Sequence, residues 1–301
     1  MDFYGILTLV ALAAVGVSAL PDTSLCGQYQ NITDSSGKYT FSTNVWGLDN
    51  SGGSCVEITD DATALSTTWS WAANDTLVHA YPNINLNAVQ RDPIPLSDLS
   101  AIDVKVSWSM KPTLSTAKAA IDESGLTATD AKTNVAIDVF FDERLEKAVN
   151  TTAPSFEVMV WIGKFGSILP IGANATTDVN TLPMEKVGGR TFHLYQGPND
   201  NGQYVFSWVS DANITDFDAD ISPLVHYLWR HGMVLAANYV GVIQFGTEQK
   251  HATSNVTFSV DDFAMSATRG TPKAAAGLSL KHSPPLQLMS ALVAIVAVAI
   301  L

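Results

Sequence analysis

Residues 156–162 read Phe-Glu-Val-Met-Val-Trp-Ile, and their alternation decides the fold class. The first residue and every second residue after it are apolar, so one face of an extended segment can lie on a hydrophobic core. The other face carries Glu157, Met159 and Trp161. A carboxylate is unusual beside an aromatic side chain on a hydrophobic strand, so Glu157 is a candidate functional residue.

The same alternation returns in residues 104–110, 204–208 and 256–260. A turn-forming sequence, Gly-Pro-Asn-Asp-Asn-Gly at 197–202, precedes the second of these segments. Residues 20–269 are therefore predicted to form one all-β domain, a sandwich of two packed antiparallel sheets.

One helix is predicted at residues 223–231, with Ser222 as its N-cap, Pro223 at the first helical position and Gly232 as its stop. Three polar segments are interpreted as long loops between strands. They are residues 111–133, 142–155 and 173–190.

Composition excludes several classes of protein. With 301 residues, of which 47% are hydrophobic and 15% charged, the chain can build a real core and is neither a disordered tail nor a coiled coil. A formal net charge of -13 disfavours nucleic acid as a partner. No Walker, GxGxxG, GxSxG or HExxH motif is present, so we expect no cofactor and no metal site.

Both ends of the chain have the character of processing signals. Residues 1–19 contain an apolar run followed by the small-residue pattern Val-Ser-Ala, which predicts a signal peptide. The run lacks a preceding Lys or Arg, so a buried N-terminal helix is the alternative.

Residues 286–301 are uncharged and almost wholly aliphatic, and residues 270–285 form a linker with small residues near its start. This order predicts a glycosylphosphatidylinositol (GPI) anchor attached at Ala274 or Ala275, with Ala275 preferred. A short membrane span and a buried tail are the alternatives.

Further features agree with secretion. Six Asn-x-Ser/Thr sequons predict a glycoprotein. The sequon asparagines are Asn31, Asn74, Asn150, Asn174, Asn213 and Asn255. In an oxidising compartment the two cysteines, Cys26 and Cys55, are expected to pair. We therefore expect an extracellular monomer that meets the membrane only through its lipid.

Three carboxylates, Asp138, Glu157 and Glu248, project from predicted strands on the face away from the core. Each alone is more simply a solvated side chain of a sandwich. Together with four tryptophans, they suggest a cleft in which aromatic rings stack on sugars and carboxylates do acid/base work. The tryptophans are Trp46, Trp69, Trp71 and Trp161.

At these residues the chain resembles glycoside hydrolase family 12, the secreted β-1,4-glucanases and xyloglucanases. Seven short motifs carry the resemblance and occur in order through nearly the whole of residues 26–267. They lie at residues 26–29, 44–47, 68–71, 134–138, 157–161, 194–199 and 245–248.

The resemblance implies a β-jelly roll with a concave substrate cleft and a retaining endo-acting mechanism on β-glucan or xyloglucan. Glu157 would be the nucleophile, Glu248 the acid/base, and Asp138 a neighbour that tunes the ionisation of the nucleophile. Trp46 would stack on a glucosyl unit on the non-reducing side of the scissile bond. The substrate-binding residues are expected to be Trp46, Trp71, Asn134, Met159 and Trp161.

The chain departs from the family pattern at several positions. Gln249-Lys250 stands where the family usually has Pro-Phe, Tyr29 replaces a Trp, and Ile137 and Phe156 replace Tyr. A carbohydrate-binding protein without catalysis therefore stays open as an alternative. A structural or adhesive wall protein is a third interpretation.

Overall fold

The computed structural model describes residues 23–59 and 62–272. The predicted signal peptide, anchor site Ala275 and aliphatic tail lie outside the described residues. Within the described part of the chain, no helix is both long and apolar enough to cross a membrane.

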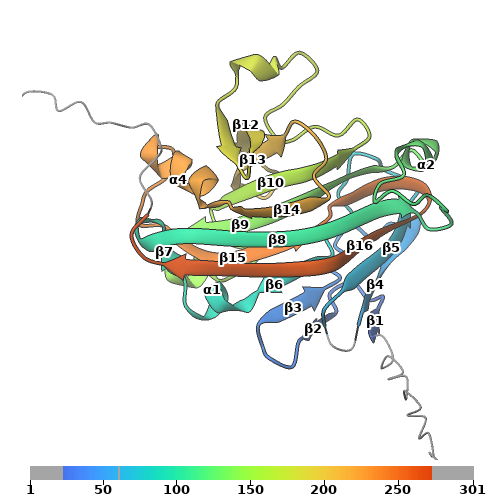
Figure 1. Ribbon diagram of the computed structural model, residues 1–301, viewed down its shortest axis with the longest axis horizontal. Coiled ribbons are helices and arrows are strands. Elements are labelled where there is room, and N and C mark those ends of the chain that lie inside the picture. The colour runs from blue at the N-terminus through green and yellow to red at the C-terminus, as the bar shows by residue number, and fades with distance from the viewer. Residues whose placement is uncertain (1–22, 60–61, 273–301) are drawn as a thin grey trace, which may run out of the picture.

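Two sheets form the body of the molecule (Figure 1). The first sheet has the strand order β1-β4-β5-β16-β8-β14. Its strands are β1 (Thr23–Leu25), β4 (Gly52–Ile58), β5 (Leu65–Trp71), β16 (Gln249–Arg269), β8 (Leu99–Pro112) and β14 (Asp216–Asp220).

The second sheet has the order β2-β3-β6-β15-β9-β10-β13-β12-β11, with β7 also paired to β15. Its strands are β2 (Asn31–Thr33), β3 (Tyr39–Ser42), β6 (Asn83–Leu86), β7 (Ile94–Pro95), β9 (Lys132–Asp142), β10 (Phe156–Phe165), β11 (Met184–Val187), β12 (Arg190–Pro198), β13 (Tyr204–Ser210) and β15 (Tyr239–Gly246). All pairs are antiparallel except β10 with β13, which is parallel and corrects the prediction of two wholly antiparallel sheets.

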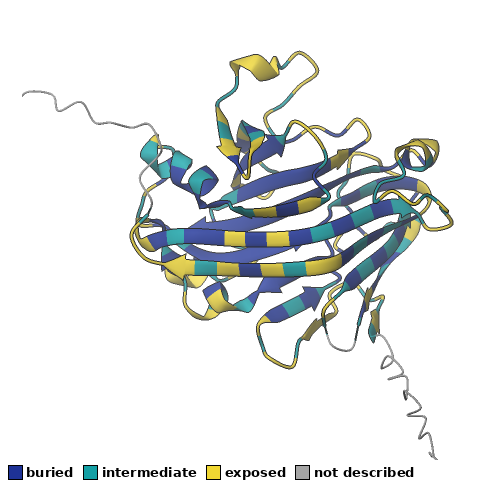
Figure 2. Cartoon of the chain, viewed as in Figure 1, coloured by how far each residue is buried: buried dark blue, intermediate teal, exposed yellow. Residues whose placement is uncertain are grey.

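The sandwich core lies between the two sheets, as the alternation predicts. In β10, Val158, Val160 and Ile162 are fully buried in the main hydrophobic cluster, which also contains side chains of β8 and β16. Buried and exposed positions alternate visibly along β8 (Figure 2). The predicted strands at 104–110, 204–208 and 256–260 are confirmed within β8, β13 and β16.

Helix α4 (Ser222–Arg230) confirms the one predicted helix but begins one residue earlier. The prediction that Ser222 is its N-cap is wrong, because Ile221 holds that position and no side chain caps the helix. The Ser222 N–H instead donates to the Asp220 carboxylate at 3.0 Å. Gly232 follows the helix at φ +70, a conformation suited to glycine that ends it as expected.

The segments predicted as loops contain short ordered elements. Helices α2 (Glu123–Ala128) and α3 (Leu145–Ala148) lie in the first two of them, and β11 and the 3₁₀ turn η2 (Val179–Thr181) lie in the third. Helix α1 (Asn87–Arg91) and the 3₁₀ turn η1 (Leu96–Asp98) complete the set. Elements of three to six residues are too short for helical periodicity to reveal them.

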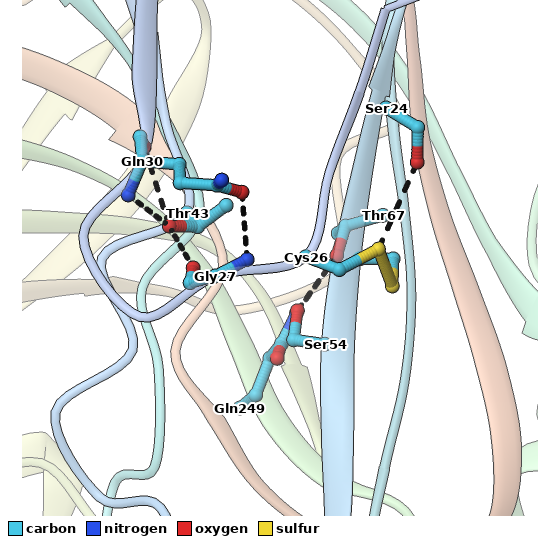
Figure 3. The surroundings of a disulfide bond; sticks show 9 residues. Ser24, Cys26, Gly27, Gln30, Thr43, Ser54, Thr67 and Gln249 are labelled. Carbon is cyan, nitrogen blue, oxygen red and sulfur yellow. Dashed lines mark hydrogen bonds between the residues drawn. A yellow bond between two sulfur atoms is a disulfide. The ribbon is translucent and has the colours of Figure 1, made fainter.

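The predicted disulfide between Cys26 and Cys55 is confirmed (Figure 3). It fastens the N-terminal segment to β4 of the first sheet. The next residues run toward β2, where the Thr43 hydroxyl donates to the Gly27 carbonyl at 2.7 Å. The disulfide therefore fixes the start of a segment that reaches the second sheet.

Five of the six sequon asparagines are exposed to solvent. Asn213 is only partly exposed, and its side chain accepts a hydrogen bond from the Lys164 N–H at 2.8 Å and donates one to Glu123 at 3.2 Å. A glycan on Asn213 would be attached to the side-chain nitrogen, which is the atom that donates to Glu123. Glycosylation of the six sites stays a prediction.

Candidate active site

A cleft of about 650 Å³ crosses the second sheet on the face away from the core. Its walls run from the neighbourhood of β2 and β3 at one end to the β12–β13 turn at the other. The lining residues are Tyr29, Asn44, Trp46, Tyr81, Asp138, Phe140, Thr151, Thr152, Glu157, Asn199, Asn201, Gln203, Gln244 and Glu248. The cleft brings together the three carboxylates that the sequence singles out.

Strand pairing places the three carboxylates on one surface. Asp138 of β9 lies opposite Met159 of β10 on one side and Gln244 of β15 on the other. Glu157 is the second residue of β10, and Glu248 stands between the end of β15 and the start of β16. Each side chain faces the cleft because its flanking residues face the sandwich core.

Burial raises the pKa of all three carboxyl groups. It raises the pKa of Glu157 to about 8, with the negative charge of Glu248 adding to the effect. The pKa of Asp138 is raised well above its usual range by burial and by the charges of Glu157 and Glu248. None of the ion pairs among the described residues includes these groups. Glu157, with a pKa of about 8, therefore holds its proton near neutral pH, and the pKa values of Asp138 and Glu248 are raised in the same direction.

Glu248 is held by hydrogen bonds with Asn134 and Thr133 of β9. The Asn134 side chain accepts a hydrogen bond from the Glu248 N–H at 3.0 Å and donates one to the Glu248 carboxylate. The Thr133 hydroxyl donates to the Glu248 carbonyl at 2.6 Å. Asn134 is fully buried beneath these contacts, so its predicted direct contact with substrate is corrected to a supporting contact with Glu248.

Trp46 lies in the wall of the cleft. Its side chain is 43% exposed and lines the cleft beside Tyr29. An exposed indole at the wall of a polar cleft is suited to stacking on the apolar face of a sugar ring. Tyr29, where the family usually has a Trp, also keeps an aromatic ring in this wall.

Trp71 is not in the cleft, and its predicted substrate contact is wrong. It is fully buried between the sheets and stacks on His79 with ring centroids 4.5 Å apart. It belongs to β5 of the first sheet, where alternation turns it into the core. Trp69, two residues earlier on the same face, is also buried in the core.

Met159 and Trp161 share the cleft-side face of β10 with Glu157 but are covered. Ile168 packs with them in a second hydrophobic cluster, and Ile171 packs against its side. Neither side chain lines the cleft that holds the carboxylates. Their predicted contact with substrate is therefore corrected to packing under the segment that follows β10.

Tyr81 is a cleft residue that the sequence analysis missed. Its ring is almost fully buried, and its hydroxyl donates to the Ala136 carbonyl at 3.2 Å. Burial and the nearby Asp138 charge raise the pKa of this phenol well above its usual value. Residue 81 precedes a proline and lies outside any alternating run, so periodicity gives no signal for it.

Comparison with known proteins assigns the chain to a family. The model described as glycosyl hydrolase family 12 matches residues 37–268, which include the whole cleft except Tyr29. The chain belongs to glycosyl hydrolase family 12. The predicted resemblance is thus confirmed.

The matches to similar proteins extend over most of this chain and nearly the whole of each similar protein. The xyloglucan-specific endo-beta-1,4-glucanase A of Emericella nidulans is 28% identical over 87% of this chain and 98% of its own. The catalytic domain of Humicola grisea Cel12A, solved with a thio cellotetraose, matches with a TM-score of 0.67 at 26% identity, covering 82% of this chain and 99% of that chain. The likeness confirms the expected jelly-roll architecture.

One similar protein is named as inactive. The inactive glycoside hydrolase XLP1 of Phytophthora nicotianae is 24% identical over 85% of this chain and 97% of its own. Similarity to family 12 therefore does not by itself establish activity, and the side chains of the site must be considered as well. This chain has all three carboxylates.

The departure from the family pattern at Gln249-Lys250 has two separate effects. Gln249 is fully buried behind the cleft. Burial raises the pKa of Glu248, and the positive charge of Lys250 lowers it by less, so the net pKa is raised. The departure thus leaves the pKa of Glu248 above its ordinary value.

Proposed function

We propose that this family 12 protein is an endo-acting β-1,4-glucanase that acts on glucans of the cellulose or xyloglucan type with retention of configuration. The observation that carries the proposal is a group of three carboxyls in one cleft beside an exposed tryptophan, with Asp138 buried and Glu157 and Glu248 half-buried. Family membership and the names of the similar proteins support hydrolysis of glucans.

The geometry of the cleft supports attack inside a polymer. Its lining residues come from both ends of the second sheet, so a glucan chain can lie across the strands rather than enter a closed pocket by its tip. Trp46 stands at one end and Asn201 at the other, with Glu157 between them.

Glu157 would act as nucleophile and Glu248 as general acid and then base. The Glu157 carboxylate attacks the anomeric carbon while Glu248 protonates the leaving oxygen. Water activated by Glu248 then releases the sugar from Glu157. Asp138 lies on the next strand and would set the ionisation of the nucleophile through its own charge.

Burial and the charge of Glu248 by themselves favour a proton on Glu157, whereas the assigned roles need it on Glu248. Azide rescue decides between the two assignments. In Glu157→Ala with an activated aryl β-glycoside, azide replaces the missing nucleophile and gives the α-glycosyl azide. In Glu248→Ala, azide attacks the covalent intermediate and gives the β-glycosyl azide. The reverse pattern would exchange the two roles.

A panel of soluble cellulose derivative, mixed-linkage glucan and xyloglucan tests the activity itself. We expect new reducing ends and rapid loss of viscosity with at least one polymer, because internal cleavage shortens chains quickly. Proton NMR should show the β-anomer first.

A carbohydrate-binding protein without catalysis is the second candidate, since one similar protein is named inactive. That function would give saccharide affinity with no new reducing ends in the same panel. The retained carboxylates disfavour it.

We also propose that the protein is secreted, glycosylated and held at the cell surface by a GPI lipid. The sequons and the terminal segments of the sequence support this proposal. Phosphatidylinositol-specific phospholipase C should release the protein from intact cells. Retention together with an intact C-terminal tail would contradict the anchor.

A further inference from the structure

Gln249 lies directly behind the Glu248 carboxyl. The two residues are consecutive, and successive side chains of an extended chain point to opposite faces. Glu248 faces the cleft, whereas Gln249 is fully buried between the sheets.

The Gln249 side chain ties this point to the first sheet. Its amide oxygen accepts a hydrogen bond from the Trp71 indole N–H at 3.4 Å. Its amide nitrogen donates to the Thr67 hydroxyl at 3.2 Å, as Figure 3 shows. Both partners belong to β5, so the start of β16 is fixed against β5 by a buried polar contact at each end of one amide.

The Gln249 backbone makes a second connection. Its N–H donates to the Ala80 carbonyl at 2.9 Å, and its carbonyl accepts from the His79 N–H at 2.8 Å. The His79 carbonyl in turn accepts from the Trp46 N–H at 3.1 Å. Residues 79–80 therefore lie between the candidate sugar platform and the backbone that carries Glu248.

We propose that Gln249 is a positioning residue that aims the Glu248 carboxyl at the leaving oxygen of the substrate, a role that rests on the proposed function. Thr133 and Asn134 hold Glu248 from β9 on one side. The Gln249 side chain fixes the adjoining backbone to β5, and the Gln249 main chain fixes it to residues 79–80. A proton donor must reach its target within about 2.6–3.2 Å. A displacement of about 1 Å costs roughly 100-fold in rate.

The quality of the leaving group separates positioning of the acid from general damage. A sugar leaving group needs the proton of Glu248, whereas a 2,4-dinitrophenolate leaves without protonation. An error in the aim of Glu248 therefore slows cleavage of a natural glucan much more than formation of the glycosyl-enzyme from the activated aryl glycoside.

The principal variant is Gln249→Leu, which keeps approximate volume and removes both amide contacts. For a cello-oligosaccharide or the preferred glucan we expect kcat to fall about 10- to 100-fold with KM within about twofold. For the 2,4-dinitrophenyl glycoside, the rate of the first step should fall less than about threefold.

Two milder variants test the same contact in case Gln249→Leu is too poorly folded to assay. Thr67 also contacts the Ser54 hydroxyl at 3.1 Å. Thr67→Val removes this contact and the Gln249 contact, whereas Ser54→Ala removes only the former. Thr67→Val should lower kcat on the glucan about three- to tenfold, while Ser54→Ala should keep the wild-type ratio of the two rates.

Equal losses on both substrates in Gln249→Leu and Thr67→Val, tracking their losses in Tm, would overturn the proposal and leave Gln249 a purely structural residue. Unchanged rates in both variants would overturn it as well. A wild-type protein that cleaves neither substrate would instead refute the proposed function, so the two failures are distinguishable.

Discussion

The two halves of the cleft-side face of β10 have opposite surroundings. Glu157 stands in an open cleft, while Trp161, four residues further along the same face, is packed under Ile168. The same face of one strand thus carries a candidate catalytic group, Glu157, and a buried packing residue, Trp161. The contrast shows that alternation assigns a residue to a face, but a later segment decides whether that face meets solvent.

The largest expected effect comes from Glu157→Ala, set against Met159→Leu on the same face. We expect the first to lower kcat on glucan by about 10⁴-fold or more, because no covalent intermediate can form. The second keeps a similar volume in a covered position and should leave kcat within about threefold. Steady-state rates on the same polymer check both, and comparable losses would mean that the covered half also touches substrate.

Ile168→Ala tests how firmly the segment after β10 packs on Trp161. Ile168 is almost fully buried on Trp161, so the truncation should lower the free energy of unfolding by about 2–4 kcal/mol. Urea unfolding monitored by tryptophan fluorescence measures this loss. A change below about 0.5 kcal/mol would show that the segment does not pack firmly on β10.

The open half should make stability depend on pH in a defined direction. The pKa of Glu157 is raised to about 8, so the folded state holds a proton that the unfolded chain releases near its ordinary pKa. The stabilisation that this raised pKa gives the folded state is fully present below about pH 4.5 and is lost as pH rises through about 8. Glu157→Gln, which cannot ionise, should match the wild type near pH 4 and be more stable near pH 9. Calorimetric Tm values at both pH values test this, and a variant that is less stable at pH 9 would contradict it.

The smallest effect separates two tryptophans that the sequence treats alike. Trp46→Ala should raise KM on glucan about tenfold with little change in Tm, because Trp46 is exposed in the cleft wall. Trp71→Phe should lower Tm and leave KM within about twofold, because Trp71 packs in the core. If Trp71→Phe raised KM as strongly, the core would be transmitting strain to the platform.

The sequence predicts the all-β fold, the disulfide and the faces of Asp138, Glu157 and Glu248, because period-two alternation and cysteine number are local signals. It does not predict which tryptophans reach the cleft. Trp46 and Trp71 differ in the sheet to which they belong, and the register of distant strands settles that. The sequence does not predict the hydrogen bonds between Asn134 and Glu248 for the same reason, since residues 114 apart in sequence meet only through strand pairing.

Strand β16 has a consequence for how the chain is made. It is 21 residues long and pairs with β5 on one side and β8 on the other, so the last strand along the described chain is a central strand of the first sheet. Until it emerges from the ribosome, β5 and β8 each present an unpaired edge. Folding during synthesis must therefore wait for residues near Arg269, and a growing chain stalled before them needs protection from aggregation.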